Sequence, residues 1–286
     1  MDKRSSLIEF VKEIYSIWVN EKPNQLAAAL AYFGMFSFAA VIYIAFRLAG
    51  IFIDEAAAAE RFYTRVAAVL GTETATFIQD SVAAVSSTNS GGSRVVTIIS
   101  LVSLLFAAMG LFLQLKYVLN RIWQVPLIEK GQRFALIRRY FFAFIIVISL
   151  GLLIILVTVL SVVLTWFGSV VSQYISGSNF ILVLEILTLI GVNVLANAFI
   201  YKVLPDVKIS WRDVWLGSFI ATILFAIGGV VIGLYFRIAG VGSAFEAAGM
   251  FAVLMIAIYY FAQIFLIGAL ITRVYARKYG SMRESS

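Results

Sequence analysis

The chain has 286 residues, of which 62% are hydrophobic and 13% are charged, and its formal net charge is +7. About a quarter of the residues in a typical soluble domain are charged, so this chain has too little polar surface to cover a water-soluble fold. It contains no cysteine and no histidine, which excludes disulfides, Cys–His zinc sites, cysteine nucleophiles and imidazole catalysis. The composition indicates an integral membrane protein.

Residues 1–24 have the apolar spacing of an amphipathic helix. We expect this helix to lie in the cytoplasmic interface of the membrane, as a simple anchor or as a membrane sensor. The apolar residues of the predicted stripe are Leu7, Phe10, Val11, Ile14, Ile17 and Trp18.

Six apolar segments follow, each of about 20 residues or more, which is enough to cross a hydrocarbon core as a helix. The predicted fold class is therefore all-α: a single membrane domain, residues 1–286, forming a polytopic bundle of six transmembrane helices. The predicted spans are 27–53, 95–115, 140–167, 180–201, 214–236 and 249–271.

Basic residues are distributed unevenly between the loops. Seventeen lysines and arginines lie in the N-terminal segment, loops 116–139 and 202–213, and the C-terminal segment, against four in the other loops. The positive-inside rule then places both termini in the cytoplasm of a prokaryotic plasma (inner) membrane. The same asymmetry accounts for the positive net charge without nucleic acid as a partner.

The first external loop, residues 54–94, is unusually long. Helical patterns cover 56–70 and 72–85, and the Ser- and Gly-rich stretch 86–93 is typical of a flexible link. We expect two short helices packed over the outer face of the bundle, either as a structural cap or as a lid over a vestibule.

Two ionisable residues lie within predicted spans, where charge is costly and often functional. Arg47 lies six residues before the end of the first span, and Glu185 lies five residues after the start of the fourth. Both are therefore roughly 8–9 Å from the outer ends of their helices, and an ion pair between them is one interpretation. The alternatives are snorkelling of Arg47 to the headgroups and a later start of the helix that carries Glu185.

Asn193 and Asn197 lie four residues apart near the middle of the fourth span and share one helix face with Glu185 nearby. We expect this polar stripe to face the bundle interior, a substrate pathway or a partner helix. Hydrogen bonding between helices is the structural alternative, at about 0.6–2 kcal/mol per contact. Gln114 and Gln263 are further polar candidates at depth.

The fifth span contains Gly229 and Gly233, a GxxxG step that favours close helix packing. Packing within the bundle and formation of a homo-oligomer are the two interpretations of this step.

Enzymatic chemistry has little support in the sequence. There is no glycine-rich nucleotide loop followed by lysine, no acidic cluster suited to two-metal chemistry and no histidine to activate a serine or threonine. We therefore expect no catalytic residues, no metal and no cofactor.

The segment 201–225 closely resembles a signature of the YihY / virulence factor BrkB family. Stretches 27–33 (AAALAYF), 119–123 (LNRIW) and 259–269 (YYFAQIFLIGA) also agree. The sequence departs from the family at Ala39 and Ala40, near where relatives carry proline, and at Leu270, where they commonly carry glutamate. The motif residues are Asn120, Trp123, Tyr201, Pro205, Asp206, Trp211 and Gly217.

The resemblance implies an inner-membrane protein of about six helices, in a family that carries an old ribonuclease label and has been linked to envelope lipids, lipopolysaccharide export and serum resistance. The motif after Tyr201 also has a local explanation. Pro205 ends a helix, Ser210 or Asp213 caps the next one, and Trp211 suits the membrane interface. A cytoplasmic gate or partner site is the alternative role.

The leading functional hypothesis is transport or flipping of a lipid-like or amphipathic anionic substrate, with Arg47 at its headgroup and the asparagine pair at its polar atoms. The first alternative is a non-transporting scaffold for envelope assembly, and the second is a membrane-embedded hydrolase. Membrane lipids are the expected partners in each case.

Overall fold

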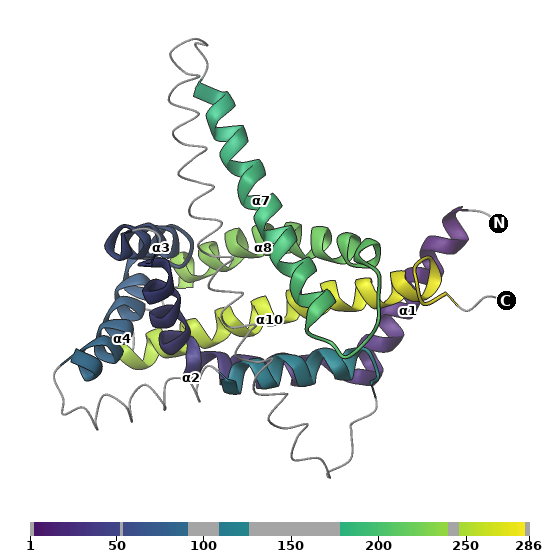
Figure 1. Ribbon diagram of the computed structural model, residues 1–286, viewed down its shortest axis with the longest axis horizontal. Coiled ribbons are helices and arrows are strands. Elements are labelled where there is room, and N and C mark those ends of the chain that lie inside the picture. The colour runs from purple at the N-terminus through teal and green to yellow at the C-terminus, as the bar shows by residue number, and fades with distance from the viewer. Residues whose placement is uncertain (1–2, 52–53, 91–108, 126–177, 240–245, 284–286) are drawn as a thin grey trace.

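The computed structural model describes residues 3–51, 54–90, 109–125, 178–239 and 246–283, and every regular element in these ranges is a helix (Figure 1). This confirms the predicted all-α class for the described part of the chain. The helices are α1 (Lys3–Glu21), α2 (Pro23–Ala49), α3 (Glu55–Leu70), α4 (Thr72–Ser90), the segment 109–122, α7 (Ser178–Val203), α8 (Trp211–Ala239) and α10 (Glu246–Lys278).

Four of these helices are long and apolar enough to cross a membrane: Pro23–Arg47, Ile186–Val203, Trp211–Tyr235 and Gly249–Lys278. They coincide with the first, fourth, fifth and sixth predicted spans. The predicted span 140–167 and most of 95–115 lie outside the described residues, so the total of six spans stays a prediction. The chain is a helical membrane protein.

Two exposed aromatic residues on α8 are separated by a distance that matches the thickness of the hydrocarbon core of a bilayer. Trp215 and Tyr235, 44% and 53% exposed, lie twenty residues apart on the same helix. At 1.5 Å per residue they are about 30 Å apart, which is the thickness of a hydrocarbon core. Tryptophan and tyrosine favour the two membrane interfaces, so both ends of this span carry suitable anchors.

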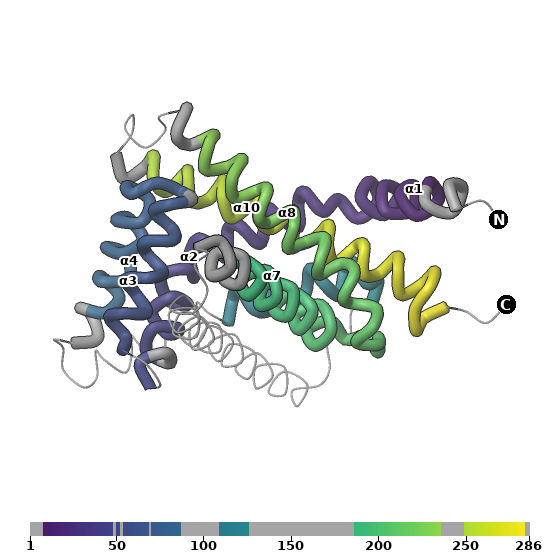
Figure 2. Tube along the Cα trace, turned by 90° about the horizontal axis from the view of Figure 1, so that it is seen from above, coloured from purple at the N-terminus to yellow at the C-terminus, as the bar shows by residue number. Residues whose placement is uncertain are grey.

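The helix α10 is central to the bundle. It packs against α8, α2, α1 and α4, while α7 packs against α8. Both termini and the connection between α7 and α8 lie at one end, here called the terminal end, and α3 and α4 lie across the other (Figures 1 and 2). The largest group of buried apolar side chains forms the main core, and most of it lies where the helices meet near the terminal end.

The helices α3 and α4 occupy the predicted external loop. Asp54 caps α3 by accepting a hydrogen bond from the backbone N–H of Ala56, and Gly71, with φ of 92°, separates the two helices. The expectation of a flexible link was wrong for residues 86–90, which continue α4. Serine and threonine only weaken a helix, and the first glycine of this stretch comes at position 91.

Candidate functional site

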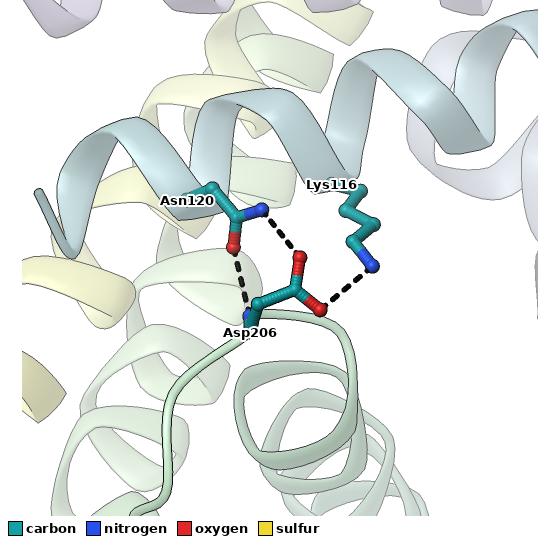
Figure 3. A network of polar contacts seen from close by, with 3 residues as sticks. All are labelled: Lys116, Asn120 and Asp206. Carbon is teal, nitrogen blue, oxygen red and sulfur yellow. Dashed lines mark hydrogen bonds and ion pairs between the residues drawn. The ribbon is translucent and has the colours of Figure 1, made fainter. Parts of the chain in front are cut away.

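One aspartate joins the connection between α7 and α8 to the helical segment 109–122 (Figure 3). Asp206 Oδ1 lies 2.8 Å from Lys116 Nζ, and Asp206 Oδ2 accepts a hydrogen bond from Asn120 Nδ2 at 2.9 Å. The Asp206 backbone N–H donates to Asn120 Oδ1 at 2.8 Å. Lys116 and Asn120 lie four residues apart and therefore share a helix face. This arrangement, the Asp206 clamp, joins two family-motif segments that lie 86 residues apart.

The connection itself follows from local sequence. The helix α7 ends at Val203, two residues before Pro205, which confirms the predicted helix stop. Ser210 Oγ then accepts a bond from the Arg212 backbone N–H at 3.3 Å, and Asp213 Oδ2 accepts one from the Ser210 N–H at 3.0 Å. This reciprocal capping confirms the predicted cap of α8 and satisfies the Arg212 N–H, while the Ser210 N–H also donates to Ser281 Oγ at 3.1 Å.

Asp213 also holds the turn that follows α10. Its side chain is 2% exposed, and its carboxylate accepts bonds from the Ser281 hydroxyl and, at 3.3 Å, from the Ser281 backbone N–H. Gly280 is required beside it, because an added Cβ would overlap the Asp213 carboxylate. A cap residue therefore also docks the C-terminal turn.

A buried arginine forms a second polar network at the terminal end. Arg273 is 2% exposed; its guanidinium donates to the backbone carbonyl of Ile122 and, at 2.6 Å, to Gln124 Oε1. Gln124 Nε2 donates to Glu21 Oε1 at 2.9 Å, and Arg121 Nε lies 2.9 Å from Glu21 Oε2. Because Ile122 ends a helix, the cation also meets the negative end of the helix dipole.

Sequence reasoning missed this role of Arg273. It was counted only among the basic residues of the C-terminal segment. The signal in the sequence is its position two residues after the predicted end of the last span, 249–271, within a helix that continues to Lys278.

Two further motif residues meet where α7, α8 and α10 cross. Tyr201 is fully buried, and its hydroxyl donates to the Phe265 carbonyl at 2.7 Å. Gly217 on α8 and Gly268 on α10 face each other so closely that a Cβ on Gly217 would overlap the Gly268 carbonyl oxygen. Glycine at both positions allows the backbones to approach, and the tyrosine packs over the contact.

The polar stripe on α7 contains one exposed and one buried asparagine. Asn197 is 5% exposed, and its Nδ2 donates to the Asn193 carbonyl at 2.9 Å and to Asn193 Oδ1 at 3.1 Å. Asn193 is exposed. The backbone of Glu185 lies in α7, but its side chain is outside the described residues.

The other predicted pathway residues lie apart from this stripe. Arg47 is exposed at the end of α2 and pairs with Glu55 at 3.3 Å, on the side of α3 and α4. Gln263 Nε2 bonds Asn24 Oδ1 at 3.5 Å, and Gln114 is half-buried in segment 109–122. The described residues therefore do not gather the candidates into one site.

The remaining candidates divide between core and surface. Trp123 is buried and Trp211 is 49% exposed at the start of α8, as expected for an interfacial residue. Gly229 and Gly233 are half-buried on α8, so their packing role stays a prediction. The described residues contain no group of three side chains suited to a metal ion.

A comparison with protein families finds one match, a family model described as Virulence factor BrkB, over residues 14–286. No curated protein and no solved structure matches the chain. The family match covers every described helix from α2 onward and the C-terminal part of α1, from Ile14 to Glu21.

Proposed function

We propose that this chain, a membrane protein that belongs to the Virulence factor BrkB family, moves an amphipathic anionic molecule such as a phospholipid across its bilayer. The family membership and the apolar spanning helices support this proposal. We also propose that it does so without enzymatic chemistry, in a prokaryotic inner membrane with both termini in the cytoplasm. The observation that supports transport best is the exposed Asn193 in the middle of a spanning helix.

Asn193 lies seven residues from Ile186 and ten from Val203, the two ends of its candidate span. It is therefore roughly 10 Å and 15 Å from those ends, near the bilayer centre. An amide at this depth is costly against acyl chains unless it has a hydrogen-bond partner. Its oxygens accept from Asn197, whereas among the described residues its Nδ2 donor has no hydrogen-bond acceptor. That donor supports a pathway for polar headgroup atoms.

The charge distribution favours an anionic cargo. Lys208 and Arg212 are exposed at the terminal end, close to the start of α8, whereas Arg47 at the opposite end of the bundle is paired with Glu55. These cations would raise the local concentration of a headgroup phosphate at the terminal end, before or after it passes Asn193.

The test is a scrambling assay in proteoliposomes that contain fluorescent NBD-phosphatidylglycerol, with dithionite to bleach the outer leaflet. We expect Asn193→Leu to lose most of the protein-dependent transfer. The matched control is Leu195→Ala, also at an exposed position on α7, which should transfer like the unmodified chain. Equal rates for Asn193→Leu and the unmodified chain, with both correctly folded, would reject the proposed pathway.

A further inference from the structure

The apolar side chains of α1 fall on two faces of the helix, whereas the sequence pattern predicted a single stripe. Phe10, Ile14, Ile17 and Trp18 are half-buried, but Val11 is exposed. Val11 belongs instead to an outer face, whose residues recur at helical spacing and are each more than half exposed. The members of this outer face are Ile8 (56%), Val11 (56%), Tyr15 (69%) and Val19 (54%).

The inner face of α1 is occupied by contacts with the rest of the chain. The Phe10 ring lies 6.4 Å from that of Tyr279, and Glu13 pairs with Lys278 at 3.2 Å. Ile17 and Trp18 pack against the main core. These contacts hold α1 in one orientation, so the outer face points away from the bundle.

The position of α1 along α10 places it at the level of lipid headgroups. The helix α10 has 33 residues and is therefore about 50 Å long, well beyond a hydrocarbon core of about 30 Å. Its contacts with α1 are made by Lys278, the last residue of α10, and by Tyr279, the residue that follows. Figures 1 and 2 show α1 beside this end of α10, and Pro23 starts the spanning helix α2 two residues after α1 ends.

Exposed cations lie at the end of the molecule that carries the outer face. Lys12 lies four residues after Ile8 and three before Tyr15, on the edge of the apolar stripe, while Glu9 lies about a third of a turn away from its centre. Other exposed cations at the same end of the molecule are Lys22, Lys208, Arg212 and Arg277, while Arg121 there is paired with Glu21. A surface with apolar side chains bordered by cations suits the boundary between anionic headgroups and acyl chains.

We propose that α1 binds the surface of an anionic lipid leaflet through Ile8, Val11, Tyr15 and Val19, with Lys12 at the phosphates. The inner face stays docked on α10 while the outer face enters the leaflet. The helix thus contacts the bundle through one face and the lipid surface through the other. This inference does not depend on transport, because it rests on α1 and its contacts alone.

The absence of cysteine allows a direct test on the full chain. Val11→Cys on the outer face and Ser16→Cys, an exposed control off that face, are each labelled with the fluorophore NBD and placed in nanodiscs of phosphatidylcholine and phosphatidylglycerol. A nitroxide group near the top of the lipid acyl chain serves as the quencher. We expect blue-shifted emission and several-fold stronger quenching at position 11 than at position 16.

Two outcomes overturn the proposal. Equal quenching at the two positions would show that the outer face does not enter the leaflet. Blue-shifted emission at position 11 that resists the nitroxide, together with disulfide cross-linking between two copies of the unlabelled Val11→Cys variant, would show that a second copy covers this face. The charge component is tested by Lys12→Glu, which should lower quenching at position 11 with phosphatidylglycerol but not with phosphatidylcholine alone.

Discussion

Replacement of Gly268 by alanine should destabilise the crossing of α8 and α10. The added Cβ would lie 2.7 Å from the Ala221 Cβ and 3.0 Å from the Gly217 carbonyl oxygen, and it would overlap the Tyr201 hydroxyl. Carbon atoms in contact are about 3.5–4.0 Å apart, so the helices would have to separate by about 1 Å. Overpacking of this kind costs about 1–3 kcal/mol.

Displacement of Tyr201 adds to this cost. Its hydroxyl would lose the 2.7 Å bond to the Phe265 carbonyl, and a buried polar group without a partner costs about 1–3 kcal/mol. We therefore expect Gly268→Ala to lower the free energy of unfolding by roughly 2–6 kcal/mol. Because both substitutions disturb the same contact, Tyr201→Phe combined with Gly268→Ala should cost less than the sum of the two single changes.

The assay measures unfolding of the protein in mild detergent, with tryptophan fluorescence as the readout. The matched control is Gly191→Ala on α7, where an added Cβ meets nothing within 4 Å. That change should be neutral or stabilise by up to about 1 kcal/mol, because alanine is the better helix former. If Gly268→Ala proves as stable as Gly191→Ala, the close crossing of α8 and α10 is incorrect.

Three further results are expected. Asn120→Asp places a second carboxylate against Asp206 and should destabilise by about 1 kcal/mol or more, and the exchanged pair Asn120→Asp with Asp206→Asn should recover most of that loss in a double-mutant cycle. Arg273→Met leaves two oxygen acceptors without donors and should cost about 1–3 kcal/mol, measured by the same unfolding assay; an unchanged unfolding midpoint would contradict the network. In intact cells, a membrane-impermeant maleimide should label Gln79→Cys but not Met282→Cys; the reverse pattern would contradict the proposed topology.

Features that depend on neighbouring residues were predictable from the sequence. The four described spans follow from apolar length, because hydrocarbon requires each backbone polar group to be satisfied within a helix. The end of α7 before Pro205 and the capping of α8 by Ser210 and Asp213 follow from backbone chemistry within a few residues. The candidate stripe at Asn193 was proposed from helical spacing alone, and its role in a pathway stays a prediction.

The sequence could not show which of several similar residues meets a distant partner. A GxxxG pattern drew attention to Gly229 and Gly233, yet the close approach between α8 and α10 occurs at Gly217 and Gly268. Glycine spacing indicates that a helix can be approached closely but does not specify the position of the crossing.

By itself the sequence determined the membrane environment, the helical class and the local boundaries at the end of α7 and the start of α8, because each depends on the composition of a segment or on interactions between residues close along the chain. Only the tertiary structure decided that Asp206 meets Asn120, that Arg273 is buried against the end of segment 109–122, and that α1 has two apolar faces. These depend on how separately stable helices dock, and docking selects partners by shape and hydrogen-bond geometry between residues far apart in sequence.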